Sequence, residues 1–153
     1  VEEARLAVAA VDYPPTGIRG VAGTTRASGF GAIPRYHARA RDEICLLLQI
    51  ETVEALEVLD EVAALDGVDG IFIGPSDLAA SMGHPGNPGH PDVHEACADA
   101  IRRVRAAGKP AGFLSPDQAF VANMIDAGSL FTAVGIDLVT LRQEALMRRE
   151  NWR

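Results

Sequence analysis

The sequence is poor in cysteine and in positive charge, and it has no long apolar run. Its 14 lysine and arginine residues are outnumbered by 21 aspartate and glutamate residues, which gives a formal net charge of −7. An acidic chain argues against nucleic-acid binding, which needs a basic face to neutralise phosphates. No apolar run approaches the roughly 20 residues of a membrane-spanning helix, and the first residues do not resemble a signal peptide. We therefore expect a cytoplasmic protein with neither nucleic acid nor membrane as a partner.

The two cysteines also exclude some kinds of chemistry. Cys45 lies in an apolar run and Cys97 in a helical pattern, far apart in the chain. Neither has neighbours at the spacing of a cysteine-based metal site or beside a base that would activate a thiol. We expect both to be buried, reduced and inert.

Apolar runs alternate with helical patterns along the chain. A hydrophobic content of 48% over 153 residues suits one domain with its own core. Short continuous apolar runs are typical of strands buried on both faces, and Gly67, Gly108 and Gly128 are placed to end helices. The predicted strands are residues 44–50, 68–74, 110–114 and 130–135, and the predicted helices are residues 1–11, 53–63, 93–107, 116–127 and 138–149.

Strands that alternate with helices pair in parallel through right-handed crossovers, so the sequence predicts an α/β fold. Two architectures remain open: a small open sheet, or the second half of a (β/α)₈ barrel, which takes roughly 250 residues. Four strands cannot close such a barrel, and a half-barrel would leave open strand edges. Because the sequence starts at Val1 rather than at Met, we expect residues to precede it.

Two carboxylates follow neighbouring predicted strands. Glu51 comes after the first strand and Asp77 after the second. In parallel α/β folds the catalytic groups gather at the carboxyl ends of the strands, and adjacent strands are about 4.8 Å apart. The pair could therefore hold one Mg²⁺ or Mn²⁺ ion. The alternative is that Asp77 caps a helix and Glu51 is a first-turn residue favoured by the helix dipole.

Two polar groups accompany these carboxylates. Gln49 shares a strand face with Glu51 because strand side chains alternate with a period of two. Its partner is either a substrate or neighbouring backbone. The turn at Gly74 and Pro75 places the Ser76 amide at a helix start, where it could hold a substrate carboxylate or phosphate. An ordinary strand-to-helix turn explains the same residues.

Two further motifs predict loops rather than chemistry. His84 and His90 lie in a segment rich in glycine and proline (residues 83–91), but a zinc site needs three or four ligands, and the sequence offers no third one nearby. We expect a lid-like loop. The spacing of Gly17, Gly20 and Gly23 lacks the ending of a phosphate-binding loop, which favours a structured loop or a subunit contact.

Five motifs follow one another along the chain: YPPTGIRG (13–20), QIET (49–52), GVDGIFIGPSDL (67–78), GHPGNP (83–88) and VGID (134–137), the last preceded by Gly128. Taken in this order, they resemble the HpcH/HpaI aldolase family, which includes 4-hydroxy-2-oxoheptanedioate aldolase and 2-dehydro-3-deoxyglucarate aldolase. The resemblance covers nearly the whole chain.

The resemblance implies a (β/α)₈ TIM barrel of the phosphoenolpyruvate/pyruvate superfamily, of which residues 1–153 supply about the last four βα units. It implies a cytoplasmic lyase of aromatic or sugar acid catabolism. The enzyme would cleave a 4-hydroxy-2-oxo acid to pyruvate and an aldehyde, through a pyruvate enolate stabilised by Mg²⁺, Mn²⁺ or Co²⁺. Glu51 and Asp77 match the metal ligands, Gln49, Ser76 and Asp77 match the substrate site, and Leu114 matches an apolar wall of the pocket.

The resemblance also implies a homo-hexamer, built as a trimer of dimers, with the last helix swapped between subunits. The family's histidine base and an arginine that holds the keto oxygen would lie before Val1, so we expect no catalytic residue in this chain and no efficient aldol chemistry from it alone. Two alternatives remain: a non-catalytic half-barrel that docks on a partner, and a CoA-thioester lyase of the citrate lyase β type.

Overall fold

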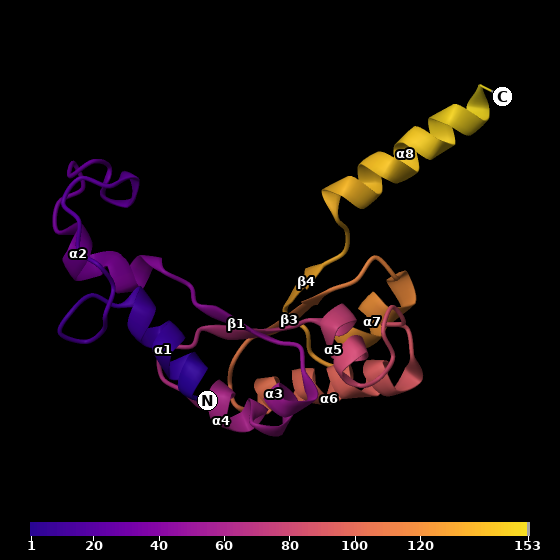
Figure 1. Cartoon of the computed structure of the whole chain (residues 1–153), viewed down its shortest axis with the longest axis horizontal. Coiled ribbons are helices and arrows are strands. Elements are labelled where there is room, and N and C mark those ends of the chain that lie inside the picture. Colours follow the sequence, from indigo (N-terminus) through magenta and orange to yellow (C-terminus); the bar gives the residue numbers. More distant parts are fainter. Residues whose placement is uncertain (153) are drawn as a thin grey trace.

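The computed structural model describes residues 1–152. Helices and strands alternate through most of the chain (Figure 1), as predicted. No helix in these residues is long and apolar enough to cross a membrane. The elements are helices α1 (Glu2–Val11), α2 (Tyr36–Arg39), α3 (Val53–Glu57), α4 (Leu59–Ala63), α5 (Pro75–Ser81), α6 (Pro91–Ala106), α7 (Gln118–Asp126) and α8 (Asp137–Asn151), strands β1 (Leu47–Ile50), β2 (Gly70–Ile73), β3 (Ala111–Leu114) and β4 (Phe131–Ala133), and short 3₁₀ turns at Arg26–Ser28 and Ala40–Glu43.

The four strands form one parallel sheet in the order β1-β2-β3-β4. Ile50 pairs with Ile73, Ile73 with Phe113, and Leu114 with Ala133. The prediction of a parallel α/β fold is therefore confirmed. Because all strands run in the same direction, their carboxyl ends meet at one edge of the sheet.

The element boundaries follow from local chemistry. The Thr52 hydroxyl accepts a hydrogen bond from the Ala55 amide at 3.1 Å and so caps α3. The predicted helix over residues 53–63 is divided at Val58, where the backbone leaves helical geometry (φ −104°, ψ 11°). Gly67 and Gly128 follow helices with φ of 87° and 112°, a backbone region that favours glycine.

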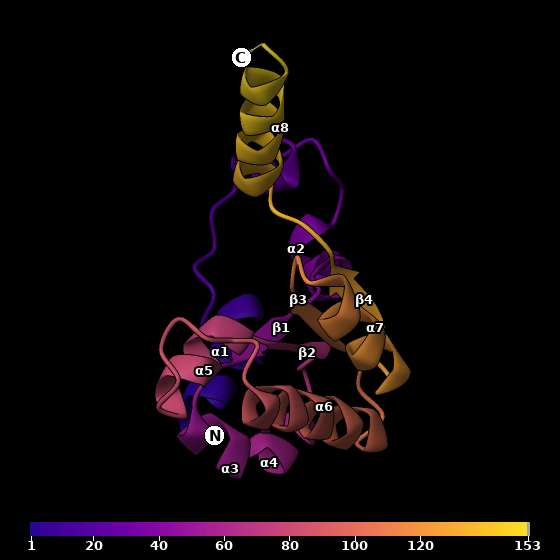
Figure 2. The same ribbon diagram turned by 90° about the vertical axis from the view of Figure 1, so that its right-hand side faces the viewer.

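One face of the sheet carries the core. The α6 helix packs on β2 and β3, and α4, α5 and α7 pack on α6. Both views show this helical layer on one side of the sheet (Figures 1 and 2). Four alternating strand residues that point into it are fully buried: Ile71, Ile73, Ala111 and Phe113.

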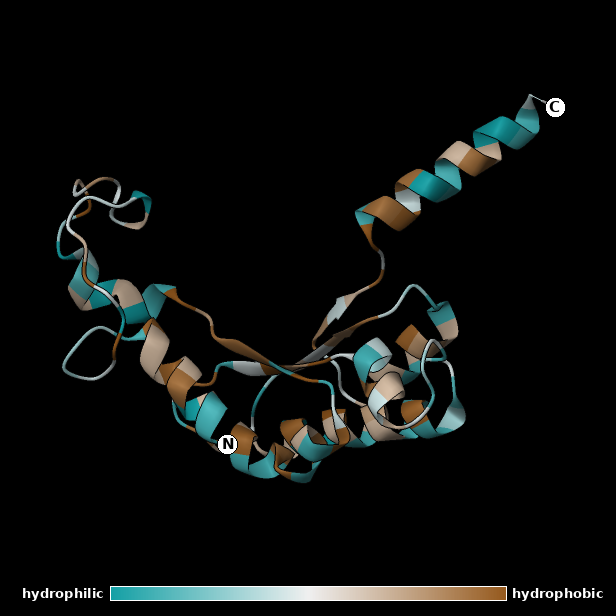
Figure 3. Cartoon of the chain, viewed as in Figure 1, coloured by the Kyte–Doolittle hydropathy of each residue, from teal (hydrophilic) through white to brown (hydrophobic). Residues whose placement is uncertain are grey.

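The opposite face of the sheet has no helical layer among the described residues. Leu47 on this face is 43% exposed, and the rings of Phe72 and Phe131 lie 6.2 Å apart beside it. Figure 3 shows the apolar colouring of β1, which crosses the sheet beside this uncovered face. Parallel sheets are normally covered by helices on both faces. The apolar side chains on this face therefore lack the packing layer that they would have in a complete parallel α/β fold.

The last helix also stands away from the sheet. The α8 helix projects beyond β4 (Figure 1), and none of its residues is buried. Leu138 and Leu141 are 71% and 68% exposed. An apolar stripe without a partner is characteristic of a helix that packs on a surface outside the described residues.

Two expectations about β1 are wrong. The strand begins at Leu47, later than predicted, and it is not buried on both faces. Cys45 lies before the strand and is exposed, whereas Cys97 is buried as expected. The strand starts later because its pairing with β2 begins at Leu47, and its exposure follows because β1 is an edge strand of a described sheet that is covered on one side only.

A network of hydrogen bonds fixes the entry to β1 against β2. The Asp69 carboxylate accepts bonds from the Leu46 amide (2.6 Å) and from both terminal nitrogens of Arg41 (3.1 Å each). Arg41 also donates to the carbonyl oxygens of Ile44 (2.9 Å) and Gly67 (2.7 Å). These bonds hold the register of the two strands at their amino ends, opposite the edge where Glu51 lies.

We expect Asp69→Asn to lower the free energy of unfolding by about 1–2 kcal/mol. Hydrogen bonds to charged groups are worth about 1.5–3 kcal/mol. The ion pair between Arg41 and Asp69 is partly exposed, and solvent weakens it. Urea unfolding would measure the loss. The exposed Asp66 supplies a matched control, and an equal loss in Asp66→Asn would contradict the assigned role of Asp69.

Candidate active site

The carboxyl edge of the sheet gathers the predicted site residues. Glu51 directly follows β1, and Gly74 directly follows β2. The Gly74 amide donates to the Ile50 carbonyl at 3.0 Å, which places Glu51 beside Gly74. Leu114 ends β3, the neighbour of β2 on its other side.

Gln49 and Glu51 act together at this edge. The Gln49 side-chain amide donates a hydrogen bond to the Glu51 carboxylate. Both side chains lie over the backbone of Gly74, where an added Cβ atom would come within 2.7 Å of Glu51 Oε2 and 2.8 Å of Gln49 Nε2. Only a residue without a side chain leaves the two groups in this position. The predicted sharing of one strand face by Gln49 and Glu51 is confirmed.

The α5 helix carries the other two predicted polar groups. It begins at Pro75, so Ser76 and Asp77 lie in its exposed first turn. Amides in a first turn have no partner within the helix. The Val53 amide donates to the Ser81 hydroxyl at 3.0 Å, which holds the segment after Glu51 against the end of α5. The structure thus brings Asp77 and Glu51 to the same edge, on neighbouring segments.

The edge is open to solvent in this chain. Gln49, Ser76 and Asp77 are exposed, and Glu51 and Leu114 are half-buried. Carboxylates and amide donors on adjacent strand ends can bind a cation together with an oxyanion. The electrostatic interactions of such an open site with a bound ion become stronger when water is excluded from the site.

The structure brings together one group that the sequence reasoning missed. His84, His90 and Asp92 approach one another in the loop between α5 and α6, and their potential ligand atoms all lie within 4.8 Å. Asp92 is therefore the third candidate ligand that was predicted to be absent. Its place two residues after His90, at the start of a helix, was the available signal.

The buried thiol takes no part in these sites. Cys97 lies on the core side of α6, and burial raises its pKa to about 12. A thiol in this environment stays protonated and unreactive near neutral pH. It is a core residue, as the sequence predicted.

The HpcH/HpaI aldolase/citrate lyase family model matches residues 1–143. The chain belongs to the HpcH/HpaI aldolase/citrate lyase family. The resemblance stated from the motifs is thus confirmed, and the parallel sheet fits part of the barrel-type fold of this family.

Named relatives share much of the sequence. The chain is 58% identical over 150 residues to a pyruvate aldolase from Rhizobium etli, and 54% identical over 151 residues to a hydroxypyruvate/pyruvate aldolase from Sagittula stellata. The matches cover 97% and 99% of this chain but 59% and 60% of those proteins. The chain therefore spans about three fifths of the length of the relatives that it matches.

A solved structure from the same family supports the fold. An HpcH/HpaI aldolase/citrate lyase family protein from Burkholderia cenocepacia superposes with a TM-score of 0.87 at 34% sequence identity. The superposition covers 97% of this chain and 61% of that chain. The whole described sheet therefore has a counterpart in a longer relative.

The prediction that this edge binds a divalent cation can be tested at Gly74: Gly74→Ala is expected to weaken Mn²⁺ binding by roughly tenfold or more, because the new methyl group displaces the Glu51 carboxylate and the Gln49 amide. Even groups that only orient a metal ligand contribute roughly 10- to 100-fold to affinity. Electron paramagnetic resonance of free Mn²⁺ would measure the change. Gly23 has open space around it, so Gly23→Ala is the control, and equal affinities in the two variants would contradict the prediction.

The thiols should differ sharply in reactivity. At pH 8 we expect iodoacetamide to modify the exposed Cys45 and to leave Cys97 unmodified, because a pKa of about 12 keeps the Cys97 thiolate scarce. Labelling of Cys97 should increase as the pH approaches its pKa, or when the chain is unfolded in urea. Peptide mass spectrometry would report both sites. Equal labelling in the folded chain at pH 8 would be inconsistent with the burial of Cys97.

Proposed function

We propose that this chain supplies the metal- and substrate-binding part of a class II aldolase. This carbon–carbon lyase would cleave a 4-hydroxy-2-oxo acid to pyruvate and an aldehyde, and would catalyse the reverse condensation. The observation that carries the proposal is the Glu51 carboxylate, held over Gly74 by Gln49 at the edge where α5 begins. The names of the relatives, which include pyruvate aldolase and 4-hydroxy-2-oxovalerate aldolase, support the same chemistry.

The residues at this edge fit a divalent cation. Glu51 and Asp77 offer two carboxylates, and among residues 1–152 no arginine, lysine or histidine pairs with either of them. Oxygen ligands suit Mg²⁺ or Mn²⁺, and Co²⁺ is a third candidate. When bound, such a cation supplies Lewis acidity that stabilises negative charge on a 2-oxo acid as its C3–C4 bond breaks.

The chain's own residues then orient the substrate. Gln49 has a second amide proton for a substrate oxygen, because its first proton goes to Glu51. We propose that the Ser76 amide, which lies in the first turn of α5, donates a hydrogen bond to the substrate carboxylate. Leu114 supplies an apolar surface at the end of β3. Fixed donors of this kind need no reorganisation when charge develops.

The base that removes the 4-hydroxyl proton is proposed to lie outside residues 1–153, together with the arginine that the family resemblance implies. Two observations favour a larger assembly: the uncovered sheet face around Leu47 and Phe72, and the unpartnered α8 helix. We propose that residues 1–153 are part of one barrel domain, that the whole protein is a cytoplasmic hexamer, and that this chain alone has no efficient aldol activity.

Two other functions are weaker candidates. A CoA-thioester lyase of the citrate lyase type would use the same carboxylates, but relatives that are 58%, 54% and 50% identical to the chain carry aldolase names. A non-catalytic half-barrel is favoured only by the bare sheet face. Such a role would not use the carboxylates of Glu51 and Asp77 at the exposed edge of the sheet.

We expect Glu51→Gln and Asp77→Asn each to weaken Mn²⁺ binding by roughly 10- to 100-fold, because each removes a charged oxygen ligand. Pyruvate should tighten Mn²⁺ binding to the unmodified chain and to neither variant, since it shares the cation with the carboxylates. Titration calorimetry with Mn²⁺, with and without pyruvate, would measure both effects.

Glu57→Gln is the matched control for this titration, because Glu57 is an exposed carboxylate on the neighbouring α3 helix. We expect the control to bind Mn²⁺ and pyruvate as the unmodified chain does. Binding that is insensitive to Glu51 and Asp77, or that pyruvate leaves unchanged, would contradict the proposed function.

A further inference from the structure

A second group of metal-binding side chains lies in the loop between α5 and α6, apart from the carboxylates already described. His84 follows α5, and its amide donates to the Ala79 carbonyl at 2.7 Å. His90 caps α6, and its Nδ1 atom accepts a hydrogen bond from the Asp92 amide at 3.2 Å. The backbone of the loop is therefore anchored at both ends, which reduces the cost of bringing ligands together.

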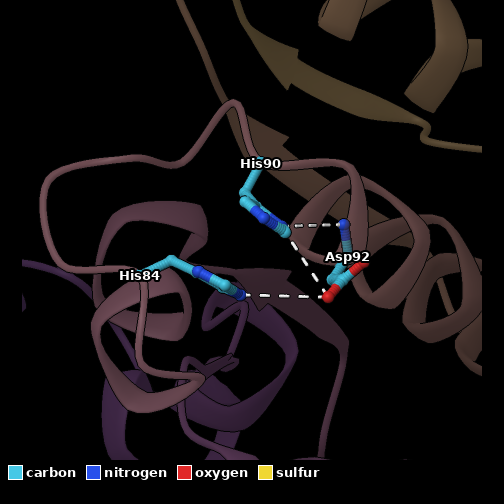
Figure 4. A group of neighbouring side chains, drawn as sticks. All are labelled: His84, His90 and Asp92. Carbon is cyan, nitrogen blue, oxygen red and sulfur yellow. Dashed lines mark hydrogen bonds and ion pairs between the residues drawn. The ribbon is translucent and has the colours of Figure 1, made fainter.

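The three side chains converge on one point (Figure 4). Asp92 Oδ2 lies 3.9 Å from His84 Nε2 and 3.8 Å from His90 Nδ1. In a tetrahedral zinc site with bonds of about 2.0–2.1 Å, the ligand atoms are about 3.3 Å apart. Both Asp92 separations are slightly longer than this, and the ligand atoms of all three residues lie within 4.8 Å of one another.

The two imidazole rings are stacked, with centroids 3.6 Å apart and planes within 12° of parallel. Ring nitrogens coordinate a metal in the plane of the ring, so parallel rings cannot both bind one ion. At least one ring must turn, and binding through His90 Nδ1 must also replace its bond to the Asp92 amide. The side chains of His84 and His90 are 27% and 31% exposed, so each ring has one side toward solvent, into which it can turn.

We propose that His84, His90 and Asp92 form a binding site for one divalent transition-metal ion of the zinc class. Two imidazoles and a carboxylate favour zinc-class ions, whereas Mg²⁺ and Ca²⁺ prefer oxygen ligands alone. This site is therefore chemically distinct from the pair formed by Glu51 and Asp77. Water would complete the coordination, because Asp92 is on the exposed side of the cluster.

The metal would fasten the end of α5 to the start of α6. His84 is bound to the last turns of α5 through Ala79, and the same helix begins with the residues of the candidate active site. An ion at this site would fix the loop over residues 83–92 and limit the movement of α5. The proposed effect is structural, and it does not depend on the proposed aldolase activity.

The test is a Zn²⁺ titration of the whole chain carrying Glu51→Gln and Asp77→Asn, which removes the other metal-binding carboxylates. We expect one Zn²⁺ per chain. His84→Ala and Asp92→Asn, each added to this background, should weaken binding by roughly tenfold or more, since groups that only orient a ligand already contribute that much. His37 is an exposed histidine elsewhere, so His37→Ala is the control and should bind Zn²⁺ unchanged.

A second measurement identifies the ligands directly. Long-range ¹H–¹⁵N correlation spectra should show the ring nitrogens of His84 and His90 shifting with one equivalent of Zn²⁺, while those of His37 and His94 stay in place. Circular dichroism would establish that each variant is folded. The proposal is overturned if no Zn²⁺ binds, if both His84→Ala and Asp92→Asn bind it as tightly as the background, or if other histidines shift instead.

Discussion

Parallel pairing of β1 with β2 is the constraint on which the candidate active site depends. The pairing places Glu51 beside Gly74, and it directs the chain into α5 at the same edge. The bonds of Asp69 and Arg41 hold the opposite ends of the same strands. The carboxylate geometry at one edge is therefore determined by the register set at the other, about four residues away along each strand.

Much of the fold could be predicted from the sequence because short local patterns determine where its strands and helices begin and end. Apolar runs predicted the four strands, and Gly67 and Gly128 ended helices as expected. The short helix α2 and the 3₁₀ turns around it were missed, since residues 26–43 have no periodic apolar pattern to predict them. The exposure of Cys45 was missed because it depends on where the strand begins and on which other segments cover it, and both are properties of the tertiary structure.

In the candidate site, too, local features could be predicted from the sequence and tertiary contacts could not. Strand periodicity was enough to put Gln49 and Glu51 on one face, and the strand ends were enough to single out Asp77. The close approach of both side chains to Gly74 depends on rotamers and strand spacing, which no short motif reports. The convergence of Asp92 with two histidines arises because the loop folds back from α5 to the start of α6, so two histidines in a loop and an aspartate in the next helix become a set of three.

The strand order has a consequence for how this chain acquires its structure. Each strand pairs with the next one in the chain, so every pairing closes a loop that contains only the one or two helices between consecutive strands. Closing such a loop costs less entropy than joining strands from distant parts of the chain, so these pairings are the most local ones that a parallel sheet allows. The sheet can therefore grow strand by strand from a single βαβ unit, and an additional strand added at β1 or β4 would extend an existing template rather than require a new nucleus.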